Sequence, residues 1–224
     1  ENLLNRIKTK KIIFKVKKIQ KINPEDLNGI KIRATGGLTS EILRELGAVP
    51  VAIAAAETYP AFQRGVIDAV SLSASDIVAY RLQEIGLYYT RVDINILVLH
   101  YCLNQRSFDA LPQDLRIALY QLLRIRSQLT VQNFYSGSGY EHAFETLRES
   151  GVEIFELEED ELNRWREKVA PLKERYIAQQ EAAGLSARAA VSDLESLAAE
   201  YASLSNSQIN DRIMNSPTQG IIDL

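Results

Sequence analysis

The stretch Asp26-Leu-Asn-Gly-Ile-Lys-Ile-Arg33-Ala-Thr-Gly36-Gly37 decides the fold that this sequence predicts. Ile30–Ile32 reads as a short apolar strand that ends at Arg33, and a glycine turn and a helix should follow. Glycines let the backbone approach a ligand, and a helix N-terminus favours an anion. An arginine can bind a carboxylate through two parallel hydrogen bonds. The stretch therefore predicts an anion site, with an ordinary exposed arginine at a strand end as the alternative.

Strand and helix patterns alternate three times after this point. Strands are predicted at 30–32, 49–53 and 66–70, and helices at 39–46, at 57–64 and from Ser75 or Asp76 onward. Such alternation indicates an α/β fold with a mainly parallel sheet and helices on its faces. Ligands of such sheets bind beyond the carboxyl ends of the strands, which is where we expect Arg33 and Ser71.

The second half of the chain is predicted to be mostly helical. The apolar run Ile94–Leu103 reads as a strand with Cys102 buried in it, and Val152–Phe155 reads as a short strand. The longest helix should begin after Ser107–Pro112 and bury one apolar stripe, formed by Leu115, Leu119, Leu122, Ile125 and Leu129. A helix over 158–180 should bend or divide at Pro171, because proline cannot continue the hydrogen-bond ladder.

Composition excludes several classes of protein. Charged residues make up 25% and hydrophobic residues 46% of the 224 residues, which is typical of a globular chain. The net charge of −3 gives no reason to expect nucleic acid as a partner. Residues 1–21 are strongly basic, and a nucleic-acid or membrane arm is one interpretation. The alternation of Lys11–Ile19 favours a strand with one charged face instead.

No pattern for catalysis, metal binding or a cofactor is present in the sequence. The Gly-x-Ser-x-Gly elbow of hydrolases and the phosphate loop are both missing. His100 and His142 lack the spacing of metal ligands, and the single cysteine cannot form an internal disulfide. No segment is long and apolar enough to span a membrane, and no signal peptide pattern is present. We therefore expect no catalytic residue, no metal and no cofactor.

Four motifs in register resemble those of TRAP-type transporter substrate-binding proteins. They are Pro24-Glu-Asp-Leu-Asn-Gly-Ile-Lys-Ile-Arg33, then Leu46–Pro50, then Glu57–Asp68, and finally Asn104 together with Phe108–Leu115. The resemblance covers roughly residues 22–182. It implies a fold like that of periplasmic binding proteins, with two α/β lobes and a long connecting helix.

The resemblance also divides the chain into parts. Residues 1–21 would be the hinge strand and a remnant of lobe I, and 22–103 the α/β core of lobe II with the anion site. Residues 104–155 would form the long inter-lobe helix and return to lobe I, and 156–224 the C-terminal helices that pack on the lobes. Family members normally have a longer segment before the hinge strand, so the N-terminal lobe is expected to be incomplete.

The function implied by the resemblance is that of an extracytoplasmic solute receptor, not an enzyme. It would capture a small organic anion in the periplasm and pass it to the membrane permease subunits of a TRAP transporter; the leader is not part of this sequence. Arg33 matches the arginine that grips the ligand carboxylate in the family. The expected ligand-binding residues are Arg33, Gly36, Gly37, Tyr59, Ser71, Leu72, Ser73, Asp93 and Asn95.

The sequence departs from the family at two places that affect the pocket. Ser71 and Leu72 stand where members often have an asparagine or a glutamate–tryptophan pair, and 54–56 is Ala-Ala-Ala where bulkier residues are usual. These changes favour a roomier and more apolar pocket. Two alternatives stay open: a truncated lobe that binds no solute and acts through protein contacts, and an α/β enzyme acting on an organic acid. No credible nucleophile or base supports the enzyme.

Overall fold

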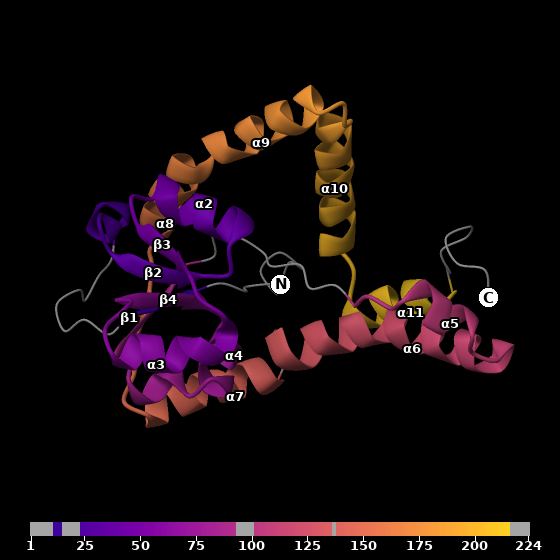
Figure 1. The fold of residues 1–224 in the computed structure, drawn as a ribbon, viewed down its shortest axis with the longest axis horizontal. Helices are drawn as coiled ribbons and strands as arrows, with labels where there is room; N and C mark the ends of the chain where they lie inside the picture. Colours follow the sequence, from indigo (N-terminus) through magenta and orange to yellow (C-terminus); the bar gives the residue numbers. More distant parts are fainter. Residues whose placement is uncertain (1–10, 15–22, 93–100, 136–137, 216–224) are drawn as a thin grey trace.

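The computed structural model describes residues 11–14, 23–92, 101–135 and 138–215 (Figure 1). Its sheet has six strands in the order β3-β2-β4-β1-β5-β6. The strands are β1 (Lys11–Phe14), β2 (Lys31–Ala34), β3 (Val49–Ala52), β4 (Ala69–Leu72), β5 (Tyr88–Arg91) and β6 (Glu153–Glu156). β1 is antiparallel to both of its neighbours, whereas β2 pairs in parallel with β3 and β4, and β5 with β6. Five strands therefore end at the same edge, and the predicted α/β sheet is confirmed.

Helices cover both faces of this sheet (Figure 1). One face packs on α2 (Gly37–Glu45) and α8 (Glu159–Val169), with Leu43 and Trp165 in its core. The other face packs on α3 (Thr58–Gln63), α4 (Ala74–Ala79) and α7 (Ser138–Glu149), with Phe62 and Phe144 in its core. Short 3-10 turns lie at Pro24–Leu27 (η1), Ala55–Glu57 (η2) and Leu82–Glu84 (η3). We call the sheet with these helices the α/β body.

The remaining helices extend away from the sheet (Figure 1). They are α5 (Gln105–Asp109), α6 (Gln113–Thr130), α9 (Pro171–Ala182), α10 (Ala187–Ala202) and α11 (Asn206–Asn215). A π-helical turn, η4 (Val131–Tyr135), follows α6 on the way to α7. α11 packs along α6, and the side-chain amide of Gln132, in η4, donates to Oδ1 of Asn210 of α11 at 3.5 Å. We call α5, α6, α10 and α11 the outlying helices; no helix among the described residues could cross a membrane.

Two strands inside the sheet differ from the prediction. The strand predicted at 66–70 is β4 at 69–72, because the chain is still turning after Gly65 and Val66 is 49% exposed. β5 was missed because Tyr88-Tyr-Thr-Arg91 looks like a polar loop, yet Thr90 is only 2% exposed between its neighbouring strands. β5 is buried although half of its residues are polar, because β1 and β6 flank it on both sides.

The prediction for α6 was right about the helix and wrong about its burial. α6 has no buried residue, and Leu115, Leu122 and Leu129 of the expected buried stripe are 50%, 56% and 44% exposed. Cys102 is also exposed, which contradicts its expected burial; residues 101–104 form no strand, and 93–100 lie outside the described residues. The predicted break at Pro171 is confirmed, since α8 ends at Val169 and α9 begins at Pro171.

Candidate functional site

Arg33 lies inside the α/β body rather than on its surface. In the register of the sheet it stands between Val51 of β3 and Val70 of β4. Its neighbours Ile32 and Ala34 pack on the α2/α8 side, so alternation along the strand places the Arg33 side chain on the α3/α4/α7 side. Arg33 is only 3% exposed. The alternative of an ordinary exposed arginine is therefore wrong.

The guanidinium of Arg33 is only partly satisfied by hydrogen bonds. Its Nε donates to the backbone oxygen of Ile53 at 3.0 Å. Its Nη1 is buried and has no hydrogen-bond partner among the described residues. Burial lowers the pKa of Arg33, and the electrostatic effects of Tyr80 and Asp76 oppose that shift. A buried charged donor without an acceptor is costly, so the site is suited to an anion that supplies one.

Gly36 and Gly37 form the turn between β2 and α2 as the sequence predicted. Gly36 is the N-cap of α2 with φ 87°, and Gly37 has φ 54°. A Cβ added at either position would meet no atom within 4 Å. The positive φ angles explain the glycines, and the open space in front of them leaves room for a ligand near the free amides of the helix N-terminus.

The three residues predicted around the end of β4 are separated by the sheet. Val70 and Leu72 belong to the core on the Arg33 side, whereas Ala69 belongs to the other core. Alternation therefore places Ser71 on the face opposite Arg33. Leu72, which is 7% exposed, shares the face of Arg33.

Ser73 and Tyr59 are already engaged within the protein. The Ser73 hydroxyl donates to Oδ2 of Asp76 at 2.6 Å and accepts from the Asp76 backbone N–H at 3.1 Å, so Ser73 is the N-cap of α4. The helix was predicted to begin at Ser75 or Asp76, whereas α4 begins at Ala74 after its cap Ser73. The Tyr59 hydroxyl donates to Oε2 of Glu84 at 3.1 Å, and this bond raises the pKa of Tyr59.

Asp93 and Asn95 lie outside the described residues. Over the ranges that the structure describes, no group of three potential metal-ligating side chains occurs.

Sequence reasoning missed the carbonyl of Ile53, which accepts from Arg33, and it missed Asp76 and Tyr80, which oppose the lowering of the Arg33 pKa. A signal for Asp76 was available, because Ser73-x-x-Asp76 is the spacing of a helix cap in which both side chains take part. Nothing in the sequence signals the carbonyl of Ile53, since its position depends on the pairing of β2 with β3.

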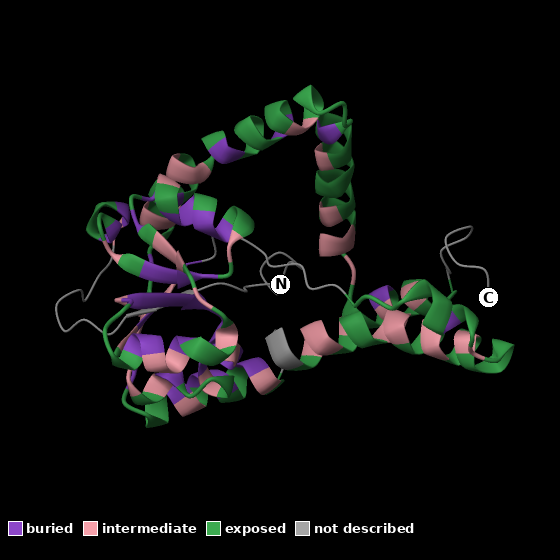
Figure 2. Ribbon diagram, viewed as in Figure 1, coloured by how far each residue is buried: buried purple, intermediate pink, exposed green. Residues whose placement is uncertain are grey.

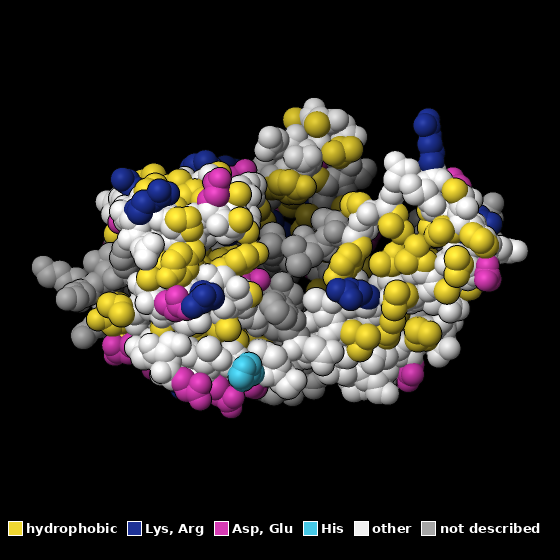
Figure 3. All heavy atoms as spheres, turned by 60° about the horizontal axis from the view of Figure 1, so that its bottom comes forward, with side chains coloured by type: hydrophobic (Ala, Val, Ile, Leu, Met, Phe, Trp, Pro, Cys, Tyr) yellow, Lys and Arg dark blue, Asp and Glu magenta, His cyan; other side chains and the backbone are white. Residues whose placement is uncertain are grey.

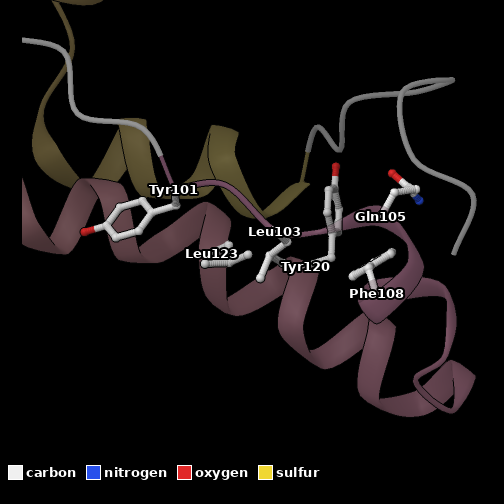
Figure 4. A pocket seen from close by; sticks show the side chains of 6 residues that line it. All are labelled: Tyr101, Leu103, Gln105, Phe108, Tyr120 and Leu123. Carbon is white, nitrogen blue, oxygen red and sulfur yellow. The ribbon is translucent and has the colours of Figure 1, made fainter.

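A separate pocket of about 230 Å³ lies on the outlying helices, away from Arg33 (Figure 4). Its lining is formed by Tyr101, Leu103, Gln105, Phe108, Tyr120 and Leu123. None of the predicted site residues that the structure describes lies in it, and its lining carries no cation for a carboxylate. We therefore place the candidate anion site at Arg33.

Residues 12–180 match the family model DctP, described as bacterial extracellular solute-binding protein, family 7. The chain belongs to this family. Family 7 consists of solute-binding proteins for transport rather than enzymes, which confirms the family and the class predicted from the four motifs.

Individual relatives in family 7 agree with this assignment. The C4-dicarboxylate-binding periplasmic protein DctP of Rhodobacter capsulatus is 27% identical over 151 residues, which are 66% of this chain and 45% of that protein. A TRAP solute-binding protein of Desulfovibrio salexigens is 27% identical with a TM-score of 0.67, covering 88% of this chain and 61% of that chain. One from Rhodoferax ferrireducens in complex with benzoate has a TM-score of 0.75 at 21% identity, covering 90% and 62%. The chain thus spans about half to three fifths of the length of these relatives.

Proposed function

We propose that this chain is the carboxylate-binding part of an extracytoplasmic solute receptor that captures a small organic acid for a TRAP-type transporter. The main support for this proposal is Arg33, because its guanidinium is buried and its Nη1 lacks an acceptor among the described residues. It lies where five strands of the sheet end, the usual place for a ligand on such sheets. The relatives support the proposal, since C4-dicarboxylates and benzoate each present a carboxylate.

The geometry defines how the carboxylate would bind. Because Nε of Arg33 is already held by Ile53, the two Nη atoms form the free end of the fork, and both can donate to one carboxylate. The bond to Ile53 fixes the guanidinium before the ligand arrives, so little side-chain entropy is lost on binding. The backbone of Gly36 and Gly37 would add amide donors, and Leu72 would contribute an apolar wall.

Membership of the family supports a proposal for the partners and the compartment. A family 7 receptor works outside the cytoplasm, and one relative is a periplasmic protein by name. We therefore place this chain in the periplasm, with delivery of the acid to membrane permease subunits.

Calorimetric titration of the chain with a panel of small organic acids tests the proposal. Arg33→Ala should weaken binding by about 2–5 kcal/mol, because it removes the donor of a buried charged pair. Arg44→Ala is the matched control, since Arg44 is exposed on the adjacent α2 and should leave affinity unchanged. Unchanged affinity in Arg33→Ala would contradict the role of Arg33.

One observation favours the second candidate, a lobe that acts through protein contacts without solute. Three leucines of α6 are exposed at a spacing of seven residues, Leu115, Leu122 and Leu129, and regular apolar rows of this kind often pair with another helix. Light scattering distinguishes the two candidates: self-association together with no binding of any acid favours the protein-contact function, whereas a monomer that binds an acid through Arg33 excludes it.

A further inference from the structure

Two of the outlying helices, α6 and α10, each have an exposed apolar face. On α6 this face is formed by Leu115, Leu122 and Leu129, and on α10 by Leu194 and Leu197. The two leucines of α10 are three residues apart, a spacing that places them on one side of the helix. α6 packs on α11, and α10 packs on α9. Each helix therefore has one packed side and one open apolar side.

The two helices carry opposite charge. α6 contains three arginines and one aspartate, whereas α10 contains three acidic residues and one arginine. Pairing α6 with a second α6, or α10 with a second α10, would bring like charges together, which is unfavourable. Pairing α6 with α10 joins opposite charges along two apolar faces.

Each apolar face also carries one exposed charged residue. Arg126 is four residues after Leu122 and three before Leu129, and Asp193 is four residues before Leu197. At these spacings each charge lies on the same side of its helix as the leucines. Both residues are exposed, and neither has an ion-pair partner within 4.0 Å among the described residues.

The two faces are not paired with each other within one chain. α10 reaches α6 only through α11, and Figure 1 shows α10 rising away from α6. A second copy of the chain offers the complementary face for both helices at once.

We propose that two copies of this chain form a dimer in which α6 of one copy packs on α10 of the other. Because the contact occurs twice, the arrangement closes around a two-fold axis. The leucines supply the apolar burial, and Arg126 of one copy pairs with Asp193 of the other, which sets the orientation of the two helices. The inference goes beyond the proposed function, because Arg33 lies in the α/β body and takes no part in the contact.

The dimer should be weak, because few side chains take part in each contact. We expect a Kd on the order of 10 µM. Since a dimer is also stabilised by its own concentration, unfolding and hydrogen exchange report on the single chain when they are measured well below this value.

Sedimentation velocity of the whole chain, from about 1 to about 100 µM at low salt, tests the inference. The unsubstituted chain should change from monomer to dimer over this range. Arg126→Glu and Asp193→Lys should each weaken the dimer about ten-fold or more, since each places like charges against each other. The double variant Arg126→Glu/Asp193→Lys restores the opposite charges and should recover the original Kd within about three-fold.

Two further variants separate a specific contact from a general effect of charge. Arg44→Glu makes the same change of net charge on exposed α2 and should leave the dimer intact. Leu194→Ala should weaken the dimer about five-fold, because it removes apolar contact. All of these positions are exposed, and thermal unfolding of each variant confirms that it is folded.

The inference is overturned if the chain stays monomeric over the whole range. It is also overturned if the double variant is as weak as the single ones, or if Arg44→Glu weakens the dimer as much as Arg126→Glu does. Arg33→Ala should dimerise as the unsubstituted chain does. Loss of acid binding in that variant and loss of the dimer in the charge variants are therefore separate results, and either proposal can fail without the other.

Discussion

The α/β body and the outlying helices have similar sequence patterns and very different packing. In the body, side chains as large as Trp165, Tyr89 and Phe62 are fully buried between the sheet and its helices. Among the outlying helices, α6 has no buried residue and α10 has one, Ala187. Figure 2 shows this contrast as purple around the sheet and green along α10 and much of α6. An amphipathic pattern thus specifies a helix, but burial needs a partner surface.

The surface of the outlying helices reflects this difference. Hydrophobic side chains gather on the part of the molecule at the right of Figure 3, where α5, α6 and α11 lie. Leu194 and Leu197 of α10 are also 66% and 50% exposed. Most helical stability in proteins comes from tertiary packing of an apolar face, so we expect these weakly buried helices to be less stable than the helices of the body.

The largest expected contrast is between a core residue of the body and an apolar residue of α6. Trp165→Ala should lower the free energy of unfolding by about 3–5 kcal/mol, because a fully buried indole is removed and a cavity remains. Leu122→Ala should change it by less than about 0.5 kcal/mol, since its side chain is 56% exposed. Urea denaturation measures both values. Equal losses would show that α6 is buried in solution, and this would contradict the difference in packing between the α/β body and α6.

Hydrogen exchange should show the same contrast without any substitution. Amides of α6 and α10 should exchange faster than those of β2 and β4, because segments with few buried contacts open locally at a low free energy. Exchange followed by mass spectrometry on peptides of 113–130, 187–202 and 31–34 measures this directly. Equal protection in all three segments would contradict a weakly packed outer region.

A pair of helix caps gives a smaller contrast. The Asn23 side chain accepts from the Asp26 N–H at 3.1 Å in the body, and the Asn104 side chain accepts from the Ser107 N–H at 3.2 Å at the start of α5. Asn23→Ala should cost about 1 kcal/mol of global stability, the usual value for a lost cap. Asn104→Ala should cost less in the same urea measurement, since α5 is not part of the main core. A larger loss for Asn104→Ala would reverse the predicted order.

The smallest effect is a pH dependence from exposed ion pairs. Lys168 and Arg164 of α8 contact Glu25 at 2.8 and 2.7 Å and lower its pKa below the usual 4.5. A carboxyl group whose pKa falls on folding adds stability above its unfolded pKa, and that contribution is lost as the pH falls through the folded pKa. Glu25→Gln should therefore flatten the decline of the melting temperature below about pH 4.5.

Glu174 provides the matched variant in the outer part of the molecule. Arg188 of α10 contacts it at 3.0 Å and lowers its pKa in the same way. Glu174→Gln should change the acid decline of the melting temperature less than Glu25→Gln, because it links α9 to a helix outside the core. The reverse order would show that α10 unfolds together with the body.

Much of the candidate site could be predicted from the sequence. The strand that ends near Arg33, the glycine turn and the following helix are local features, and the structure contains all three. The face on which Ser71 lies could not be predicted, because it depends on where β4 begins, and the strand was displaced by three residues. The partner of Arg33, the carbonyl of Ile53, also depends on the pairing of β2 with β3, which joins residues about 20 positions apart in the chain.

The sequence by itself determined the family and the alternation of strands and helices, and it pointed to Arg33, which we propose as the anion-binding residue. These follow from motifs and periodicities within short segments, where neighbouring residues decide the backbone conformation. Only the tertiary structure decided that Arg33 is buried with an unsatisfied Nη1, that its Nε is held by the carbonyl of Ile53, and that three leucines of the α6 stripe are exposed. Burial and electrostatic environment are set by which segments pack against each other, and a single strand or helix does not contain that information.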